Sequence, residues 1–301
     1  MIANQLPLLR RELWEHRSIY VAPAVIALLI SLMAVTGQVT VSAHDEAVDF
    51  SVLGASNLTE AHRAAILSAL MWGVGALFAL SMTILIVFYT LDSLHAERKD
   101  RSILFWRSMP TTDTETVLSK LLMAMFVIPL GTIAAVLVTH VVVLACASIW
   151  VAGRGADAWH LIWSAAPFAE LWIATFVFFL ALPLWLSPFI GWFLFVSAFA
   201  RRSTLLVAFL PLLILPMLEK SLVGTDLLAE AFFLRSVEIP LFRGTSTGEF
   251  GFLQGDSFSF LMLSRLDIVG FLTSPGLWLG LVVCGLLTAA AIYLRRYRDD
   301  S

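Results

Sequence analysis

The dominant pattern along the chain is a series of long apolar runs separated by short polar segments. A helix needs about 20 apolar residues to cross roughly 30 Å of hydrocarbon. Six runs approach or exceed that length. We therefore predict membrane-spanning helices at about 19–41, 64–91, 117–151, 168–200, 204–218 and 276–294. Prolines lie inside several runs, notably Pro129, Pro183 and Pro188, so we expect those helices to bend or break.

Composition supports a membrane location. The chain has 301 residues, of which 59% are hydrophobic and 14% are charged, whereas soluble domains carry about 25% charged residues. This predicts an all-α polytopic membrane protein with a single transmembrane domain over residues 1–301. Cys146 and Cys284 both lie in apolar runs and form no recognisable pair pattern.

The basic residues are distributed unevenly between the two sides of this topology. Thirteen of the 19 Lys and Arg residues fall on the side that holds both termini, and six fall on the other side. Because cytoplasmic loops are enriched in Lys and Arg, both termini are expected in the cytoplasm.

Residues 4–17 precede the first span and have helical periodicity. Leu6, Leu9, Leu13 and Trp14 fall near one face, and the three arginines of the segment fall mostly elsewhere. The pattern predicts a helix lying in the membrane interface, within a terminal segment 1–18. The alternative is a solvated, frayed terminus.

Residues 219–275 form a long segment on the outer side, between the fifth and sixth spans. Its apolar patches are interrupted by polar, glycine-containing sequence, so the segment is too apolar for a loose loop and too broken for another span. We expect short helices that re-enter the membrane or lie on the outer leaflet. A small ordered cap is the alternative.

The chain lacks a recognisable catalytic motif. It contains no H-E-x-x-H or G-x-S-x-G sequence, and none of its three lysines lies in a G-K-[ST] phosphate loop. We therefore expect no enzyme activity, bound cofactor or metal in this chain alone. Ionisable residues within or near spans are candidates for function: His140, Glu170, Glu219 and Lys220. Each also has a structural interpretation, a helix–helix hydrogen bond for His140 and snorkelling at span ends for the others.

Residues 97–110 read ERKDRSILFWRSMP. The stretch is too short to cross a membrane and too apolar for a solvated loop. It predicts a helix of about two turns that ends at Pro110. The TDTE sequence at 112–115 then forms a capping box that opens the third span.

This short helix would present an aromatic, apolar face rimmed by arginines. Trp, Phe and Arg in one compact patch are typical of a protein–protein anchor. The alternative is that the same face dips into the inner leaflet.

Residues 91–120, LDSLHAERKDRSILFWRSMPTTDTETVLSK, resemble the loop after the second span in the ABC-2 type permeases, the membrane subunits of bacterial ABC exporters. The rest of the chain resembles that family in architecture only. The resemblance implies that the loop 92–116 holds a coupling helix, which sits in a cleft of a separate ATP-binding subunit. The coupling residues would be Glu97, Arg98, Arg101, Ile103, Leu104, Phe105, Trp106, Arg107 and Met109. The short loop that contains Arg201 and Arg202 would be a candidate second contact.

The resemblance further implies a homodimer of permeases with two ATP-binding subunits in the bacterial inner membrane. ATP and Mg would bind to the partner subunit, and no nucleic acid would be involved. The expected function is export of a hydrophobic or amphipathic substrate, such as a peptide, drug or lipid-like molecule. The alternatives are a related membrane subunit for sensing or immunity without net transport, or a polytopic membrane enzyme.

Overall fold

The computed structural model describes residues 5–36, 40–43, 46–49, 60–99, 112–164, 167–237, 239–242 and 266–297. This part of the chain is helical apart from two short antiparallel strands, in which Thr40 lies opposite Asp49. The strands are β1 (Thr40–Ala43) and β2 (Glu46–Asp49). The helices are α1 (Gln5–Glu15), α2 (Ser18–Val35), α4 (Glu60–Lys99), α6 (Asp113–Leu122), α7 (Ile128–Ala152), α8 (Phe168–Trp185), α9 (Ser187–Phe199), α10 (Thr204–Leu222), α11 (Leu227–Val237), α12 (Ile268–Thr273) and α13 (Pro275–Tyr297), with π-helical turns η2 (Met123–Val127) and η3 (Trp159–Trp163).

Within these ranges, six helical segments are long and apolar enough to cross a membrane, which makes the chain a multi-pass membrane protein. They are Ser18–Val35, Ile66–Lys99, Asp113–Ala152, Phe168–Trp185, Thr204–Leu222 and Pro275–Tyr297. The first ends at Val35, earlier than the predicted residue 41. Thr40 and Val41 are instead in β1, in keeping with the preference of β-branched residues for strands.

The fourth predicted span, 168–200, is not one helix. It divides at Leu186 into α8 and α9. Pro183 and Pro188 flank the division, and a proline removes one backbone donor and clashes with the preceding turn. The prolines therefore interrupt this span, as expected from the sequence, and α8 alone is long enough to cross a membrane.

The third span shows the opposite outcome. Pro129 was expected to interrupt it, but helix continues from Asp113 to Ala152 through η2. In this turn the amide of Ile128 donates to the carbonyl of Met123, five residues earlier. A π-helical turn just before a proline absorbs the missing backbone bond without ending the helix.

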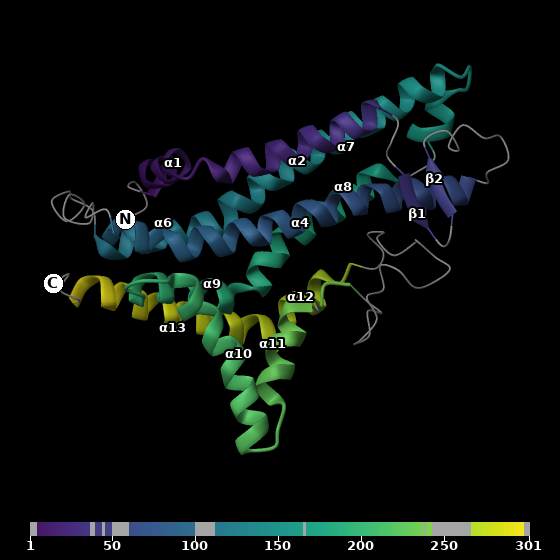
Figure 1. Cartoon of the computed structure of the whole chain (residues 1–301). Helices are drawn as coiled ribbons and strands as arrows, with labels where there is room; N and C mark the ends of the chain where they lie inside the picture. The colour runs from purple at the N-terminus through teal and green to yellow at the C-terminus, as the bar shows by residue number, and fades with distance from the viewer. Residues whose placement is uncertain are drawn as a thin grey trace.

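The elements form an elongated bundle (Figure 1). Both termini, α1 and the start of α6 lie at one end, called here the terminal end, and β1 and β2 lie at the opposite end. Helix α2 packs along α7, and α9 packs between α4 and α13. The core is apolar, and the side chains of Phe78, Met82, Leu144 and Phe179 are fully buried in it.

Helices α10 and α11 form a hairpin that projects sideways from the bundle (Figure 1). Among the residues of α10, only Ala208 is buried. Its exposed side chains are almost all leucine, phenylalanine, isoleucine or methionine. Such a helix suits a hydrocarbon environment, which solvates apolar side chains as well as a protein core does.

One arginine fastens this hairpin to the bundle. Arg235 of α11 donates from Nε to the carbonyl of Trp185 at 3.0 Å and from Nη1 to that of Gly276 at 2.8 Å. Its guanidinium lies 4.4 Å from the Trp185 ring centroid, and Trp185 Nε1 donates back to the Arg235 carbonyl at 3.1 Å. Partial burial lowers the pKa of the Arg235 guanidinium, which still keeps its charge. We call these contacts the Arg235 clip.

Candidate functional site

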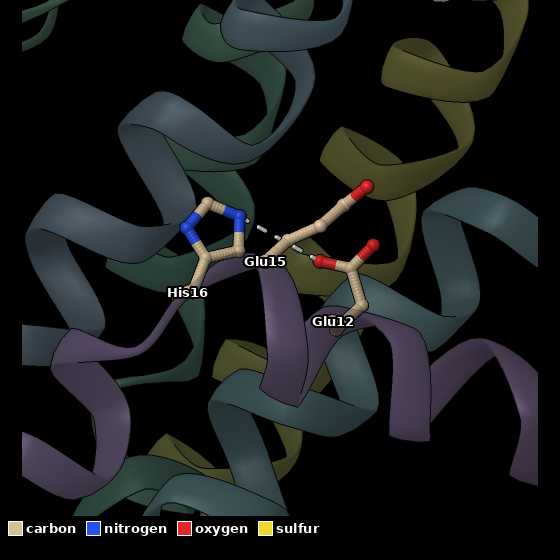
Figure 2. Close-up of side chains that lie close together, drawn as sticks. All are labelled: Glu12, Glu15 and His16. Atoms are coloured by element: carbon tan, nitrogen blue, oxygen red, sulfur yellow. Dashed lines mark ion pairs between the residues drawn. The ribbon is translucent and has the colours of Figure 1, made fainter.

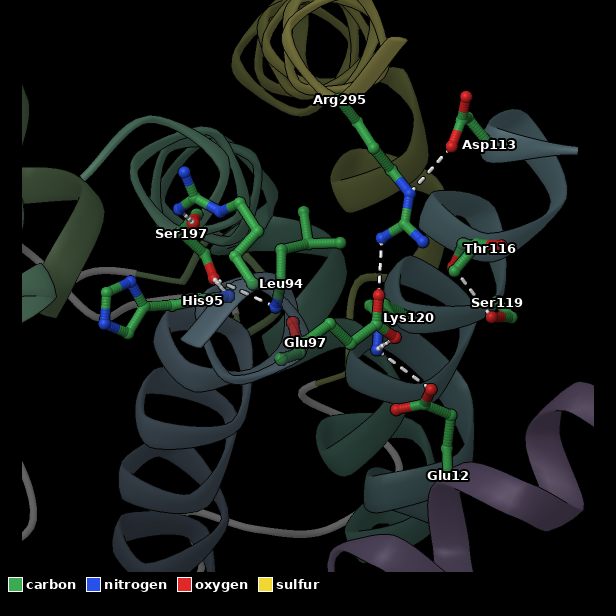
Figure 3. A network of polar contacts seen from close by, with 12 residues as sticks. Glu12, Leu94, His95, Glu97, Asp113, Thr116, Ser119, Lys120, Ser197 and Arg295 are labelled. Atoms are coloured by element: carbon green, nitrogen blue, oxygen red, sulfur yellow. Dashed lines mark hydrogen bonds and ion pairs between the residues drawn. The ribbon is translucent and has the colours of Figure 1, made fainter. Parts of the chain in front are cut away.

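A cluster of charged side chains lies at the terminal end of the bundle, where α1, α4, α6 and α13 meet (Figure 3). Each helix contributes from its last or first turns. The members, which we call the ion cluster, are Glu12, Glu97, Asp113, Lys120 and Arg295.

Lys120 is the buried cation of this cluster. Its Nζ lies 2.9 Å from Glu12 Oε1 and 3.0 Å from Glu97 Oε1. Lys120 is 0% exposed, Glu12 1% and Glu97 5%. Tyr89 also donates to Glu12, from Oη to Oε2 at 2.8 Å. Charges removed from water to this extent persist only when they are paired and hydrogen-bonded.

Arg295 of α13 connects two helices that flank the predicted coupling stretch. Its Nη1 lies 2.6 Å from Glu97 Oε2, and its Nε lies 2.9 Å from Asp113 Oδ1 (Figure 3). Glu97 lies near the end of α4, and Asp113 is the first residue of α6. The two ends of the connection between α4 and α6 are therefore held by the same guanidinium.

This geometry changes the role expected for Glu97. The sequence placed Glu97 among residues that contact a partner, but its side chain is buried within the chain against Lys120 and Arg295. The reason is charge compensation: three helices bring cations to this point, and Glu97 is the carboxylate they share. Arg11 adds a longer contact, 3.6 Å from Glu97 Oε1.

The next residue, Arg98, points to a different part of the bundle. Its Nη2 donates to the carbonyls of Ser197 and Ala200 at the end of α9. The hydroxyl oxygen of Ser197 in turn accepts the amides of Leu94 and His95, at 3.1 and 3.0 Å. The two bonds from Arg98 satisfy carbonyls that a helix C-terminus leaves without intrahelical donors. Arg98 was predicted to meet a partner, but it is engaged by α9.

The predicted capping box at the start of the third span is confirmed. Thr112 accepts the Glu115 amide through its side chain, and the Glu115 carboxylate accepts the Thr112 amide at 3.0 Å. Glu115 also anchors α1, because its carbonyl accepts a 3.4 Å hydrogen bond from Gln5. The cap thus sets where α6 begins, one residue before Asp113 enters the ion cluster.

The remaining predicted coupling residues lie outside the described residues: Arg101, Ile103, Leu104, Phe105, Trp106, Arg107 and Met109. Arg201 and Arg202 are described and exposed in the short connection between α9 and α10. They directly follow Ala200, whose carbonyl accepts the bond from Arg98. Arg98, at the start of the predicted coupling loop, is therefore hydrogen-bonded next to Arg201 and Arg202, the candidate second contact.

His140 is buried between helices. Its Nε2 lies 3.0 Å from the Met71 carbonyl, which joins α7 to α4. This contact agrees with the structural interpretation of the residue, a hydrogen bond between helices.

The other polar candidates lie apart from the ion cluster along the sequence and in different helices. Glu219 caps α11: its carboxylate accepts the amides of Leu227 and Leu228 and the hydroxyl of Thr225, at 3.1, 2.7 and 2.7 Å. Lys220 forms an exposed ion pair with Asp226 at 3.1 Å. Both stabilise the turn between α10 and α11, where Gly224 has a φ of +76° that favours glycine.

Glu170 lies in the first turn of α8 and is half-buried. A carboxylate is favoured there by the partial positive charge of a helix N-terminus.

Three side chains on α1 and the turn that follows it could surround a cation. Glu12, Glu15 and His16 each offer a ligand atom, all within 4.8 Å of one another (Figure 2). However, Lys120 and Tyr89 already bind the Glu12 carboxylate. Glu15 is held by Arg11 at 2.9 Å. A cation would have to displace these partners, so we assign no metal site.

Four central members of the cluster were not predicted from the sequence as site residues: Glu12, Asp113, Lys120 and Arg295. In the sequence, Glu12 falls in the expected interfacial helix and Asp113 in the capping box. Lys120 and Arg295 are two of the basic residues that indicate the cytoplasmic side. A usable signal was present, because Lys120 lies between Val117 and Leu121 in an apolar context, where an ionisable group needs a partner. Its partner could not be identified from the sequence, since Glu12 is 108 residues away.

Comparison with protein-family models, curated proteins and solved structures finds no match for this chain. The functional interpretation therefore depends on the residues and geometry above.

Proposed function

We propose that this chain is the permease subunit of an ATP-driven exporter of the ABC-2 type. In this proposal a separate ATP-binding subunit hydrolyses ATP, and the connection between α4 and α6 receives the resulting movement. Two permease copies and two ATP-binding subunits would form the complex in a bacterial inner membrane, with the terminal end in the cytoplasm. The substrate would be hydrophobic or amphipathic.

The main support is the pair of ion pairs that Arg295 makes, one with Glu97 before this connection and one with Asp113 after it. A force applied to residues 100–111 would reach Glu97 and Asp113, and through Arg295 it would reach α13. Lys120 extends the linkage to Glu12 on α1. Coupling between sites needs such contiguous contacts between elements that can take up two arrangements.

Arg98 adds the second half of this linkage. It fastens the same turn of α4 to the end of α9, beside the exposed Arg201 and Arg202. A displacement of the end of α4 would therefore act on α9 through Arg98 and on α13 through Arg295. This arrangement is what a transmission point requires.

The experiment tests binding and coupling separately. The chain is co-expressed with a candidate ATP-binding subunit, and the complex is purified in detergent. Truncating a buried anchor aromatic typically costs ~2 kcal/mol, roughly thirtyfold in affinity. Trp106→Ala and Phe105→Ala should therefore reduce the amount of ATPase retained. Trp159→Ala is the matched control, because Trp159 is an exposed tryptophan in η3, outside the connection between α4 and α6.

Retention of the ATPase and of transport by both variants would contradict the coupling role, and membrane anchoring of residues 103–106 would become the better explanation. ATPase binding without any substrate-stimulated hydrolysis or transport would instead favour a sensing or immunity role.

A further inference from the structure

Helix α1 has two faces with different surroundings. The inward face buries Leu8 and Glu12 against the bundle, and Leu9 and Leu13 pack against its core. This differs from the sequence prediction, which grouped both leucines with Trp14 on one membrane-facing side. The bundle takes up these leucines because Glu12 must reach Lys120, which fixes how α1 is rotated.

The outward face combines apolar and basic side chains. Leu6 is 76% and Trp14 70% exposed, and Arg10 and Arg17 are exposed with them. Leu6, Arg10 and Trp14 are four residues apart, which aligns them on one side of α1. Arg17 lies in the turn that follows α1. The prediction that the arginines lie elsewhere was wrong for Arg10. Arg10 shares the exposed stripe with the apolar residues, and Arg17 adds a second exposed cation just after it.

Carboxylates balance only one of the arginines near this face. Arg11 is neutralised by Glu15, with Nη2 2.9 Å from Oε1. The guanidinium of Arg10 instead lies 5.2 Å from the Trp14 ring centroid. Within the described ranges, neither Arg10 nor Arg17 has a carboxylate within ion-pair distance. Leu6, Pro7, Arg10, Arg11, Trp14 and Glu15 line an open hollow here, which therefore has a net positive charge.

The connection to α2 places this face at the membrane surface. Only His16 and Arg17 separate α1 from α2, which is long and apolar enough to span the membrane. Tyr20 and Val21, in the first turn of α2, are already exposed and belong to the lipid-facing surface of that helix. The hydrocarbon therefore begins close to Ser18, and α1 lies at the depth of the headgroups.

We infer that the outward face of α1, together with Arg17 in the turn after it, binds anionic phospholipid headgroups. Trp14 and Leu6 insert at the boundary of the acyl chains, and Arg10 and Arg17 bind lipid phosphates. The arginine over the tryptophan ring keeps the cation at the edge of the apolar contact. This inference does not depend on the transport function proposed above.

The test uses the full chain purified in detergent and titrated with phosphatidylglycerol or phosphatidylcholine, with bound lipid counted by native mass spectrometry. Each arginine near an anionic surface contributes enough to change affinity about fivefold. Arg10→Gln and Arg17→Gln should each weaken phosphatidylglycerol binding by about that factor, and should leave phosphatidylcholine binding unchanged. Arg10→Lys should keep most of the affinity.

Arg154→Gln is the matched control, since Arg154 is an exposed arginine in the turn after α7, away from α1 in the sequence. It should leave phosphatidylglycerol binding unchanged. None of the variants changes the contact between Glu12 and Lys120, so α1 should remain folded. Hydrogen exchange at residues 8–13 checks this in each variant.

Equal binding of the two lipids by the wild-type chain would overturn the proposal. An equal loss of phosphatidylglycerol binding in Arg10→Gln and Arg154→Gln would do so as well, because it would show a general charge effect. So would protection of the outward face that appears only with a co-purified protein and is insensitive to lipid.

Discussion

Two buried or half-buried arginines hold this molecule together in different ways. Arg295 binds two carboxylates at the terminal end, in a cluster that joins four helices. Arg235 binds two backbone carbonyls and an aromatic ring, and fastens one hairpin to the break between α8 and α9. The first site is a set of opposite charges that depend on one another. The second is a cation held by neutral dipoles.

The difference predicts how far a change at each site should spread. Removing one partner of a buried ion pair leaves an uncompensated charge, which is strongly unfavourable. Removing a cation from carbonyl groups leaves acceptors without donors, which costs less. Damage to the ion cluster should therefore affect the whole bundle. Damage to the Arg235 clip should affect mainly α10 and α11.

The largest effect is expected for Arg295→Gln. Glu97 would lose a close cation while remaining buried, so the free energy of unfolding should fall by ~3–5 kcal/mol. The measurement is the fraction of folded chain in mixed micelles as the proportion of a denaturing detergent is increased. Arg296→Gln is the control, because Arg296 is adjacent in sequence but exposed.

Arg295→Lys sharpens this test. It keeps the charge but loses the forked geometry that reaches Glu97 and Asp113 together, so it should recover only part of the stability. Equal stability of Arg295→Gln and Arg296→Gln would show that the cluster does not hold the four helices together.

An intermediate, local effect is expected for Gly280→Ala. A Cβ at this position would overlap Nη2 of Arg235 and would lie 3.1 Å from Cγ of Pro188. Arg235 would have to leave the clip, at a cost of roughly 1–3 kcal/mol for the carbonyl acceptors it abandons. Hydrogen exchange should accelerate over residues 227–237, while global unfolding changes little.

Gly285→Ala is the control for that substitution. Gly285 lies in the same helix, but a Cβ there meets nothing within 4 Å. If both alanine variants exchanged like the wild type, the clip would not be what holds α11 to the bundle.

The smallest effect is expected for Thr112→Ala. This residue lies beside the ion cluster but acts as an uncharged cap, and loss of such a cap typically costs about 1 kcal/mol. The same unfolding titration should detect it, with faster exchange at residues 113–116. Thr114→Ala, an exposed change in the same turn, should have no comparable effect. A loss as large as that of Arg295→Gln would mean that position, and not charge, determines sensitivity at this end.

Several features of the molecule could be predicted from the sequence because they depend on neighbours along the chain. Apolar run length set the number of membrane-spanning helices. The Thr112–Glu115 spacing identified the start of α6. The periodicity of residues 4–17 identified α1. Each of these signals is contained within a few helical turns, where propensity, capping and hydrophobic length act.

The tertiary structure alone decided which charges meet and which faces remain exposed. Glu97 and Arg295 are 198 residues apart, and Glu12 and Lys120 are 108 apart. No local pattern specifies such pairings, because they follow from how four helices pack at one end. The same packing rotates α1 so that Arg10 and Trp14 point outward. It also places Arg235 beside the break at Leu186, where proline had removed the local helix bonds.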